Sequence, residues 1–133
     1  MADIKIFNPA TMGTPLGQFS HVTRVKASEF IFIAGQVGVF HNGDFAEGFE
    51  AQCAQAYENT RLALESCDAN WANVVQFTTY LAHLQDIPRF MNYRLKEFPR
   101  FFHKGCYPPN TLLVVDRLVK ESLLFEVHTV AAL

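Results

Sequence analysis

The spacing of the apolar residues changes along the chain, and this change limits the folds available to it. Before residue 49 the apolar stretches are short, and residues 30–34 form one continuous apolar run. From residue 49 onward, apolar residues recur at steps of three and four, which is typical of an amphipathic helix. They are Phe49, Cys53, Tyr57, Thr60, Leu64 and Cys67. The sequence therefore predicts strands followed by a helix.

A second helical pattern follows residue 86. Asp86 is a suitable N-cap and Pro88 falls in the first turn, where a missing N–H is tolerated. Pro99 is expected to end or kink this helix. The apolar stripe, which we interpret as core and not as a cofactor site, is Ile87, Phe90, Met91, Leu95, Phe98 and Phe102.

Six segments have strand-like patterns, namely residues 4–7, 19–26, 30–34, 74–82, 111–117 and 123–131. The short connections predict two hairpins, one between 19–26 and 30–34 and one between 111–117 and 123–131. We expect a single α+β domain over residues 1–133. Its predicted architecture is a mostly antiparallel six-stranded sheet with two helices packed on one face.

Two helices leave the other face of such a sheet uncovered. That face would carry Leu112, Val114, Leu124 and Val130, or their alternating neighbours. Because an uncovered apolar surface marks an interface, we expect an oligomer.

Composition excludes several classes of protein. The net charge is −2 and no segment carries a basic run, which argues against a nucleic-acid partner. Cys53, Cys67 and Cys106 lack the spacing of a zinc site, the histidines lack metal-ligand spacing, and the glycines form no phosphate-binding motif, so no metal or cofactor is expected. The N-terminus lacks the pattern of a secretory signal and no apolar stretch could span a membrane, which favours a cytoplasmic protein.

Five ordered segments resemble the RidA (YjgF) family. They are the strand that ends at Gly35-Gln36, the helix with Gln52 and Asn59, the strand over residues 73–81, the segment from Pro108 to Leu118, and the closing strand around Glu126. The resemblance implies a RidA/chorismate-mutase-like fold. It also implies a homotrimer whose sheets face inward, with small-molecule clefts between subunits.

Archetypal members of that family hydrolyse reactive enamines and imines and release ammonia. An arginine holds the substrate carboxylate, and an acidic residue on the last strand positions the water. Here Asn110 stands at the arginine position, and Asn110 carries no charge. The sequence departs from the family pattern at three further cleft positions, which are His21, Ala34 and Leu112.

The resemblance and the strand pattern together nominate the site residues. Glu126 is the candidate catalytic residue, and His128 lies two residues on, so both side chains point to one face. The candidate binding residues are Asn110, His21, Arg24, Gly35, Tyr107 and His128. For Glu126 and His128 the alternative is a structural role at a wet interface, and for His21 and Arg24 it is exposure to solvent. Arg117 is interpreted as structural.

Three hypotheses about function follow. The first is a trimer that hydrolyses an imine, an enamine or a related small metabolite, with the range of substrates altered by Asn110. The second is a trimer that binds a small ligand or another protein without catalysis. The third is an endoribonuclease, and the acidic charge balance argues against it.

Overall fold

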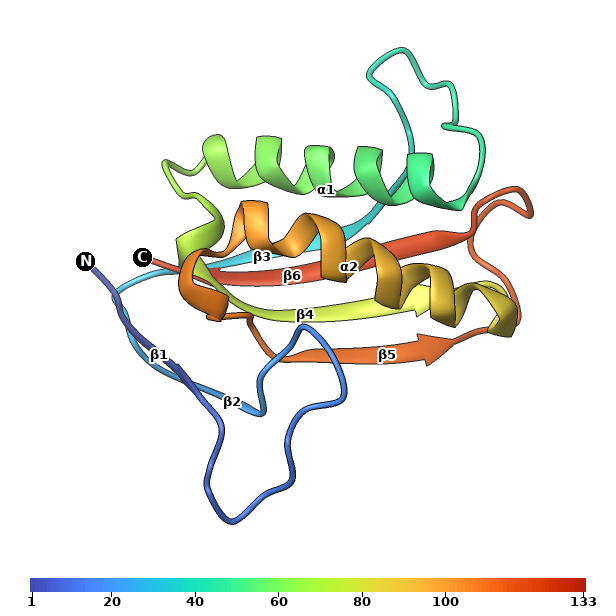
Figure 1. The fold of residues 1–133 in the computed structure, drawn as a ribbon. Helices are drawn as coiled ribbons and strands as arrows, with labels where there is room; N and C mark the ends of the chain where they lie inside the picture. Colours follow the sequence, from blue (N-terminus) through green and yellow to red (C-terminus); the bar gives the residue numbers. More distant parts are fainter.

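The computed structural model describes the backbone of residues 1–133 and every side chain except that of Lys104. In chain order the main elements are β1 (Asp3–Phe7), β2 (Val22–Lys26), β3 (Phe30–Val37), α1 (Phe49–Glu65), β4 (Val74–Leu81), α2 (Ile87–Phe101), β5 (Asn110–Val114) and β6 (Phe125–Ala132). The α+β class and the two helices are confirmed, and both helices lie on the same side of the main sheet (Figure 1).

The strands form two sheets, so the expectation of one six-stranded sheet is wrong. The larger sheet has the order β3-β6-β4-β5, and β1 pairs with β2 in a separate ribbon. Strand β6 is antiparallel to β3 and to β4, whereas β5 runs parallel to β4. The main sheet is therefore mixed, because α2 carries the chain back to the starting end of β4 before β5 begins.

Neither predicted hairpin forms. The turn after β2 directs its backbone to the C-terminus, where the amides of Ser28 and Glu29 both donate to the carbonyl of Leu133. Strand β3 consequently pairs with β6, and β2 pairs with β1. Strand β6 has both of its edges occupied by the eight-residue strands β3 and β4, which leaves β5 to pair with β4 alone.

The core lies between the two helices and the main sheet, and its centre is aromatic. The ring of Tyr57 on α1 is in edge or tilted contact with Phe98 of α2 and with Phe125 of β6, each at a centroid distance of 5.5 Å. Phe90, Phe98 and Phe102 of the predicted α2 stripe are also buried, which confirms that these members are core. Leu95 is 58% exposed, so its assignment to the core is wrong.

The second helix differs from expectation at its ends. Asp86 occupies the N-cap position, but its side chain accepts a hydrogen bond from Arg89 and does not cap the backbone. Pro99 lies inside the helix, which continues to Phe101. The missing N–H of Pro99 therefore does not stop the helix two residues before its end.

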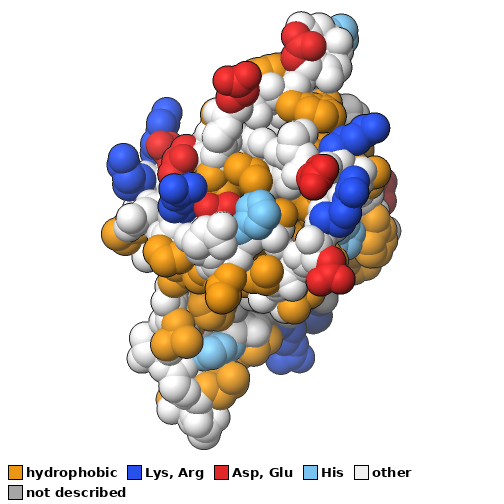
Figure 2. Space-filling model, turned by 90° about the vertical axis from the view of Figure 1, so that its right-hand side faces the viewer, with side chains coloured by type: hydrophobic (Ala, Val, Ile, Leu, Met, Phe, Trp, Pro, Cys, Tyr) orange, Lys and Arg blue, Asp and Glu red, His pale blue; other side chains and the backbone are white. Residues whose placement is uncertain are grey.

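The face of the main sheet opposite the helices is open and carries large apolar side chains. Phe30 is 52% exposed and Phe32 is 74% exposed, and Leu113 is also exposed. Leu113 is an alternating neighbour of the expected Leu112, which packs against the core instead. Phe30 and Phe32 lie on β3, a strand that contributed no residue to the expected apolar face. In Figure 2, which shows one end of the molecule, hydrophobic side chains lie between scattered charged groups, and Lys and Arg form separate groups next to Asp and Glu.

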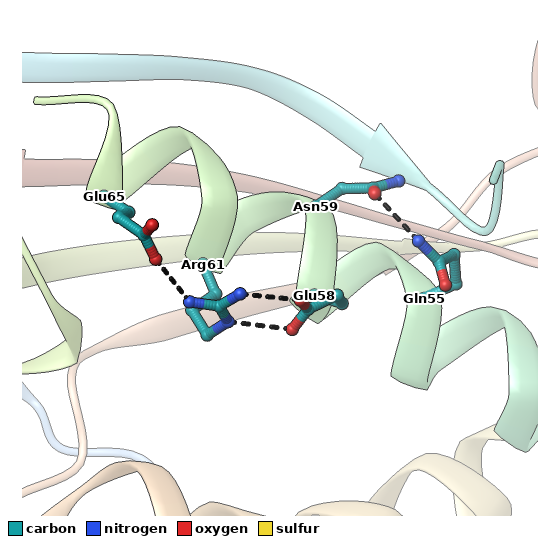
Figure 3. A network of polar contacts seen from close by, with 5 residues as sticks. All are labelled: Gln55, Glu58, Asn59, Arg61 and Glu65. Carbon is teal, nitrogen blue, oxygen red and sulfur yellow. Dashed lines mark hydrogen bonds and ion pairs between the residues drawn. The ribbon is translucent and has the colours of Figure 1, made fainter. Parts of the chain in front are cut away.

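A partly buried polar network on α1 helps to hold the end of β3 (Figure 3). The side-chain amide of Asn59 accepts a hydrogen bond from the side chain of Gln55 and donates to the backbone carbonyls of Val37 and Val39. On the same helix Arg61 pairs with Glu58 and Glu65. Because Val37 ends β3 and Val39 follows it, Asn59 fixes the exit of that strand against α1.

Candidate functional site

A cavity of about 490 Å³ opens on the uncovered face of the main sheet, a volume in the range of small-molecule sites. Strands β3, β4 and β6 contribute to it, together with the loop that follows β5. Its lining residues are Gly35, Tyr80, Val115, Arg117, Leu118, Val119, Glu126 and His128.

Glu126 reaches this cavity because Gly35 has no side chain. A Cβ at Gly35 would lie 2.7 Å from Cδ of Glu126 and would overlap its Oε2. The pairing of β3 with β6 shifts between Ile33 and Gln36, so Gly35 lies in a bulge. The backbone φ of Gly35 is not positive. Close approach of the carboxylate is therefore what requires glycine at this position.

Strand register places two further side chains of the cavity, those of Tyr80 and His128, relative to Glu126. Tyr80 on β4 is directly opposite Glu126 on β6, and Thr78 is opposite His128. Since side chains two residues apart on a strand share a face, Glu126, His128 and Tyr80 all point to the open side. The predicted shared face of Glu126 and His128 is confirmed by their position in one cavity.

Glu126 is not engaged by other protein groups. Its carboxylate makes no hydrogen bond or ion pair with any residue that the structure describes. It is partly accessible to solvent. A carboxylate in this state can accept a proton or a hydrogen bond from a bound water or ligand.

Arg117 provides a cation in the same cavity. Its Nε donates to the carbonyl of Leu118 and its Nη2 to that of Val119, at 3.1 and 3.3 Å. Arg117 makes no ion pair within the described part of the chain. Two backbone contacts therefore orient an unpaired guanidinium at the wall of the cavity.

Gln52 holds the loop that carries these groups. Its buried side chain donates to the carbonyls of Ala46 and Ser122 and accepts from the amide of Leu124 at 2.7 Å. Leu124 lies two residues before Glu126. Gln52 thus links α1 to the segment that leads into β6 and fixes the position at which β6 begins.

Asn110 lies on the other side of the sheet. Asn110 is opposite Phe77 in the parallel pairing, and Phe77 faces the helices. Its Oδ1 accepts a hydrogen bond of 2.6 Å from the buried hydroxyl of Thr79. Within one chain Asn110 therefore does not share a cavity with Glu126.

The remaining nominated residues also lie apart from Glu126. The Nε2 atom of His21 is 2.6 Å from the carbonyl oxygen of Gly13, and His21 lines a separate hollow of about 330 Å³ that also includes Pro109. Arg24 is exposed on β2, and Tyr107 packs against Phe98 on the helix side. Of the seven nominated residues, the cavity brings together Gly35, Glu126 and His128.

Among the polar residues of the cavity, sequence reasoning missed two, Tyr80 and Arg117. Tyr80 lies on the strand over residues 73–81 that was recognised, but its alignment with Glu126 depends on a β4–β6 pairing that local patterns did not reveal. The sequence pattern predicts that Arg117 ends the strand over residues 111–117 and favours a structural role for it. It lies in a loop, beyond the end of β5 at Val114.

The described side chains include no group of three or more His, Cys, Asp or Glu residues placed to hold a metal ion. None of the helices in the described chain has the length and apolar character needed to cross a bilayer.

Comparison with known proteins gives one consistent family. The family model for endoribonuclease L-PSP matches residues 11–133. A RutC family protein of Pyrococcus abyssi is 30% identical over 119 residues, which cover 88% of this chain and 87% of that protein.

Solved structures agree with this match. A conserved Rid family protein of unknown function from Yersinia pestis has a TM-score of 0.87 and 26% identity, with 98% of each chain covered. RidA from an Antarctic Psychrobacter has a TM-score of 0.71 at 22% identity, which shows the shared fold. The chain therefore belongs to the endoribonuclease L-PSP family, which is the RidA (YjgF) family that its sequence resembles.

Proposed function

We propose that this protein is a homotrimer that hydrolyses small imines or enamines in clefts between its subunits. The observation that carries the proposal is the unengaged carboxylate of Glu126, held over Gly35 in a cavity that also contains Arg117. Such a cavity combines a proton acceptor with a cation, the two groups that hydrolysis of a carboxylate-bearing imine requires.

The uncovered sheet face supports the assembly. Phe30, Phe32 and Leu113 are exposed on a face whose other side is packed with helices. Burial of these side chains between copies would remove apolar surface from water at about 25 cal/mol per Å². A trimer also offers a role for the hollow at His21 and Pro109, which would face the Glu126 cavity of a neighbouring copy.

In the proposed reaction Glu126 accepts a proton from water as the water oxygen bonds to the imine carbon. The electron pair of the C=N bond moves to nitrogen, and Glu126 passes the water proton to that nitrogen, which gives a neutral carbinolamine. Glu126 then accepts the proton of the carbinolamine hydroxyl and donates it to nitrogen as the C–N bond breaks, so ammonia leaves, a carbonyl compound remains and Glu126 is again ionised. Water is the only co-reactant.

Arg117 would bind the substrate carboxylate, which the uncharged side chain of Asn110 cannot do by charge pairing. The guanidinium is oriented by Leu118 and Val119, and Nη1 is left without a protein partner. A carboxylate on the substrate would pair with it in the cavity. The altered position of the cation would change which imines fit, compared with archetypal members of the family.

The test is release of ammonia from freshly generated 2-iminobutyrate, measured against the spontaneous rate. We expect a clear acceleration by the protein and a loss of roughly 10²-fold or more in Glu126→Gln, because the proton acceptor is removed. Glu121→Gln, in the exposed loop before β6, is the matched control and should retain the wild-type rate. Equal rates for wild type and Glu126→Gln would overturn the proposal.

One set of contacts favours a second candidate, a trimer that binds small ligands without catalysis. Both His21 and Asn110, at positions where the family has cleft residues, have side chains engaged by Gly13 and Thr79. Saturable binding of 2-oxobutyrate, without any acceleration of imine hydrolysis, would support this candidate over the enzyme.

The name of the matching family, endoribonuclease L-PSP, also raises RNA cleavage as a candidate activity. The net charge of −2 and the separated basic groups in Figure 2 give little attraction for a polyanion. We expect no binding of single-stranded RNA at any salt concentration. Binding that weakens steeply as salt rises would contradict this expectation.

A further inference from the structure

The most unusual charged group in the described structure is Arg94 on α2. The residue is 2% exposed, and it lies on the side of the sheet opposite the Glu126 cavity. Its guanidinium carbon is 4.6 Å from the centroid of the Phe90 ring and 5.7 Å from that of Phe19. Two aromatic rings therefore flank the cation, and it is shielded from water.

The polar atoms of Arg94 are largely unpartnered. Nη2 donates to the sulfur of Met91 at 3.2 Å, but Nε and Nη1 are buried and make no hydrogen bond with any described group. Arg94 also makes no ion pair within the described chain. Since arginine keeps its proton in proteins, an unpaired buried charge remains.

Tyr57 presents a second unpartnered polar atom to the same part of the core. Its ring contacts Phe98, one turn along α2 from Arg94, and it contacts Phe125, which also packs on Phe90. The Tyr57 hydroxyl is buried and has no partner. Of the four such side-chain atoms among the described residues, three belong to Arg94 and Tyr57.

The segment before β2 covers this cluster. Gly17 lies so near that a Cβ on it would be 2.8 Å from Cε of Met91 and 3.1 Å from Nη2 of Arg94. Phe19 closes over the guanidinium from the same segment. The cover explains how a cation with free donors can be removed from solvent although no carboxylate of the described chain reaches it.

We propose that Arg94, together with the hydroxyl of Tyr57, binds a small monovalent anion on the helix-covered side of the sheet. The anion is a halide or the carboxylate of a small organic acid. Both present a single negative charge that accepts hydrogen bonds from Nε or Nη1 and from the tyrosine hydroxyl. A water molecule could satisfy the same donors but would leave the charge of Arg94 uncompensated.

The other arginines show why Arg94 stands apart. Arg61, Arg89 and Arg100 each pair with a carboxylate of their own helix turn or N-cap. Arg24 and Arg117 are exposed, so water solvates them. Arg94 alone among the described arginines combines burial with the lack of an anionic partner.

The first test compares the melting temperatures of wild type, Arg94→Met and Arg24→Met in increasing sodium formate and, separately, sodium bromide. An anion bound at Arg94 raises the melting temperature of wild type and Arg24→Met by roughly 4 °C for each tenfold increase above its dissociation constant. Arg94→Met should lack this increment, and general effects of salt cancel in the comparison. The two salts show whether a halide, a carboxylate or both are bound. The same response in all three proteins, to both salts, would overturn the proposal.

The second test does not depend on the folding of a variant. Crystals of the wild-type protein soaked in bromide should show an anomalous peak within hydrogen-bond distance of Nε or Nη1 of Arg94. Crystals soaked in formate should show a planar molecule at the same place. Water alone at these atoms in both soaks would refute an anion site, whatever the melting temperatures of the variants.

Discussion

The two faces of the main sheet differ in nearly every physical respect, although the same strands build both. On β6, Phe125 and Val127 are completely buried beneath the helices, while Glu126 and His128, which alternate with them, face the open side. The buried face is aromatic and close-packed around Tyr57. The open face has a carboxylate, an imidazole and a cavity, with exposed phenylalanines nearby.

This difference teaches how a short domain separates stability from chemistry. Alternation along a strand places neighbouring residues in different environments without any change of backbone. Substitutions on one face should therefore change the free energy of unfolding, and substitutions on the other should change assembly or reactivity. The comparison is sharpest for adjacent residues of β6.

The largest expected effect on stability comes from Phe125→Ala. The side chain is fully buried and contacts three rings, those of Phe49, Tyr57 and Phe90. Its truncation should lower the free energy of unfolding by about 4 kcal/mol, because apolar burial is lost and a cavity remains. Urea unfolding followed by fluorescence of Trp71 measures this, and a loss below about 1 kcal/mol would break the comparison.

A smaller loss is expected from Gln52→Leu, which removes the clamp between α1 and the start of β6. The amide of Leu124 and the carbonyl of Ser122 would lose their side-chain partner. The free energy of unfolding should fall by about 2 kcal/mol. Gln85→Leu, at an exposed position, is the control and should leave it unchanged.

A further loss of stability, which arises on the helix-covered face, is expected at alkaline pH. Burial raises the pKa of Tyr57 well above 10.0 and that of the Cys53 thiol well above 9.0. Both groups are neutral when protonated, so the folded protein holds their protons more tightly than the unfolded chain does. The two groups therefore contribute fully to the stability of the folded protein below pH 9.0. The contribution of Cys53 declines as pH rises above 9.0, and that of Tyr57 declines as pH rises above 10.0. Urea unfolding at pH 8 and above pH 10 should show the decline, and Tyr57→Phe should reduce it; an unchanged decline in that variant would count against this account.

The smallest expected effect on stability is that of Glu126→Gln. The carboxylate forms no hydrogen bond or ion pair with described groups, so its neutralisation should change the free energy of unfolding by less than about 0.5 kcal/mol. A loss as large as that of Phe125→Ala, measured in the same urea experiment, would show that Glu126 is structural. Stability and activity should thus respond in opposite order at these two adjacent positions.

The sequence predicted the helices and strands better than it predicted which strands pair with each other. Spacing of apolar residues identified both helices and the aromatic core, because a helix with one apolar face must bury it. Strand pairing depends instead on contacts far apart in the chain. The carbonyl of Leu133 accepts hydrogen bonds from the amides of Ser28 and Glu29, although Leu133 is more than a hundred residues away from them along the chain. No local pattern contains that contact, and the hairpin predictions failed for this reason.

The candidate site divides in the same way. The period of two along β6 sufficed to place Glu126 and His128 on one face, and the family resemblance singled out Gly35. The bulge that brings Gly35 beneath Glu126 is a property of the β3–β6 register. Arg117 enters the cavity through a loop held by backbone contacts, and Asn110 turns to Thr79 on the helix side. Both outcomes depend on tertiary structure.

The central claim is that the open sheet face is an assembly surface that completes the site. Sedimentation equilibrium at micromolar concentration tests it most directly, with the wild type compared with Phe32→Asp. The account predicts a wild-type mass three times that of the 15.1 kDa chain, and dissociation of the folded Phe32→Asp variant, since an exposed aromatic side chain on that face becomes charged. A wild-type protein that sediments as a stable monomer would contradict it.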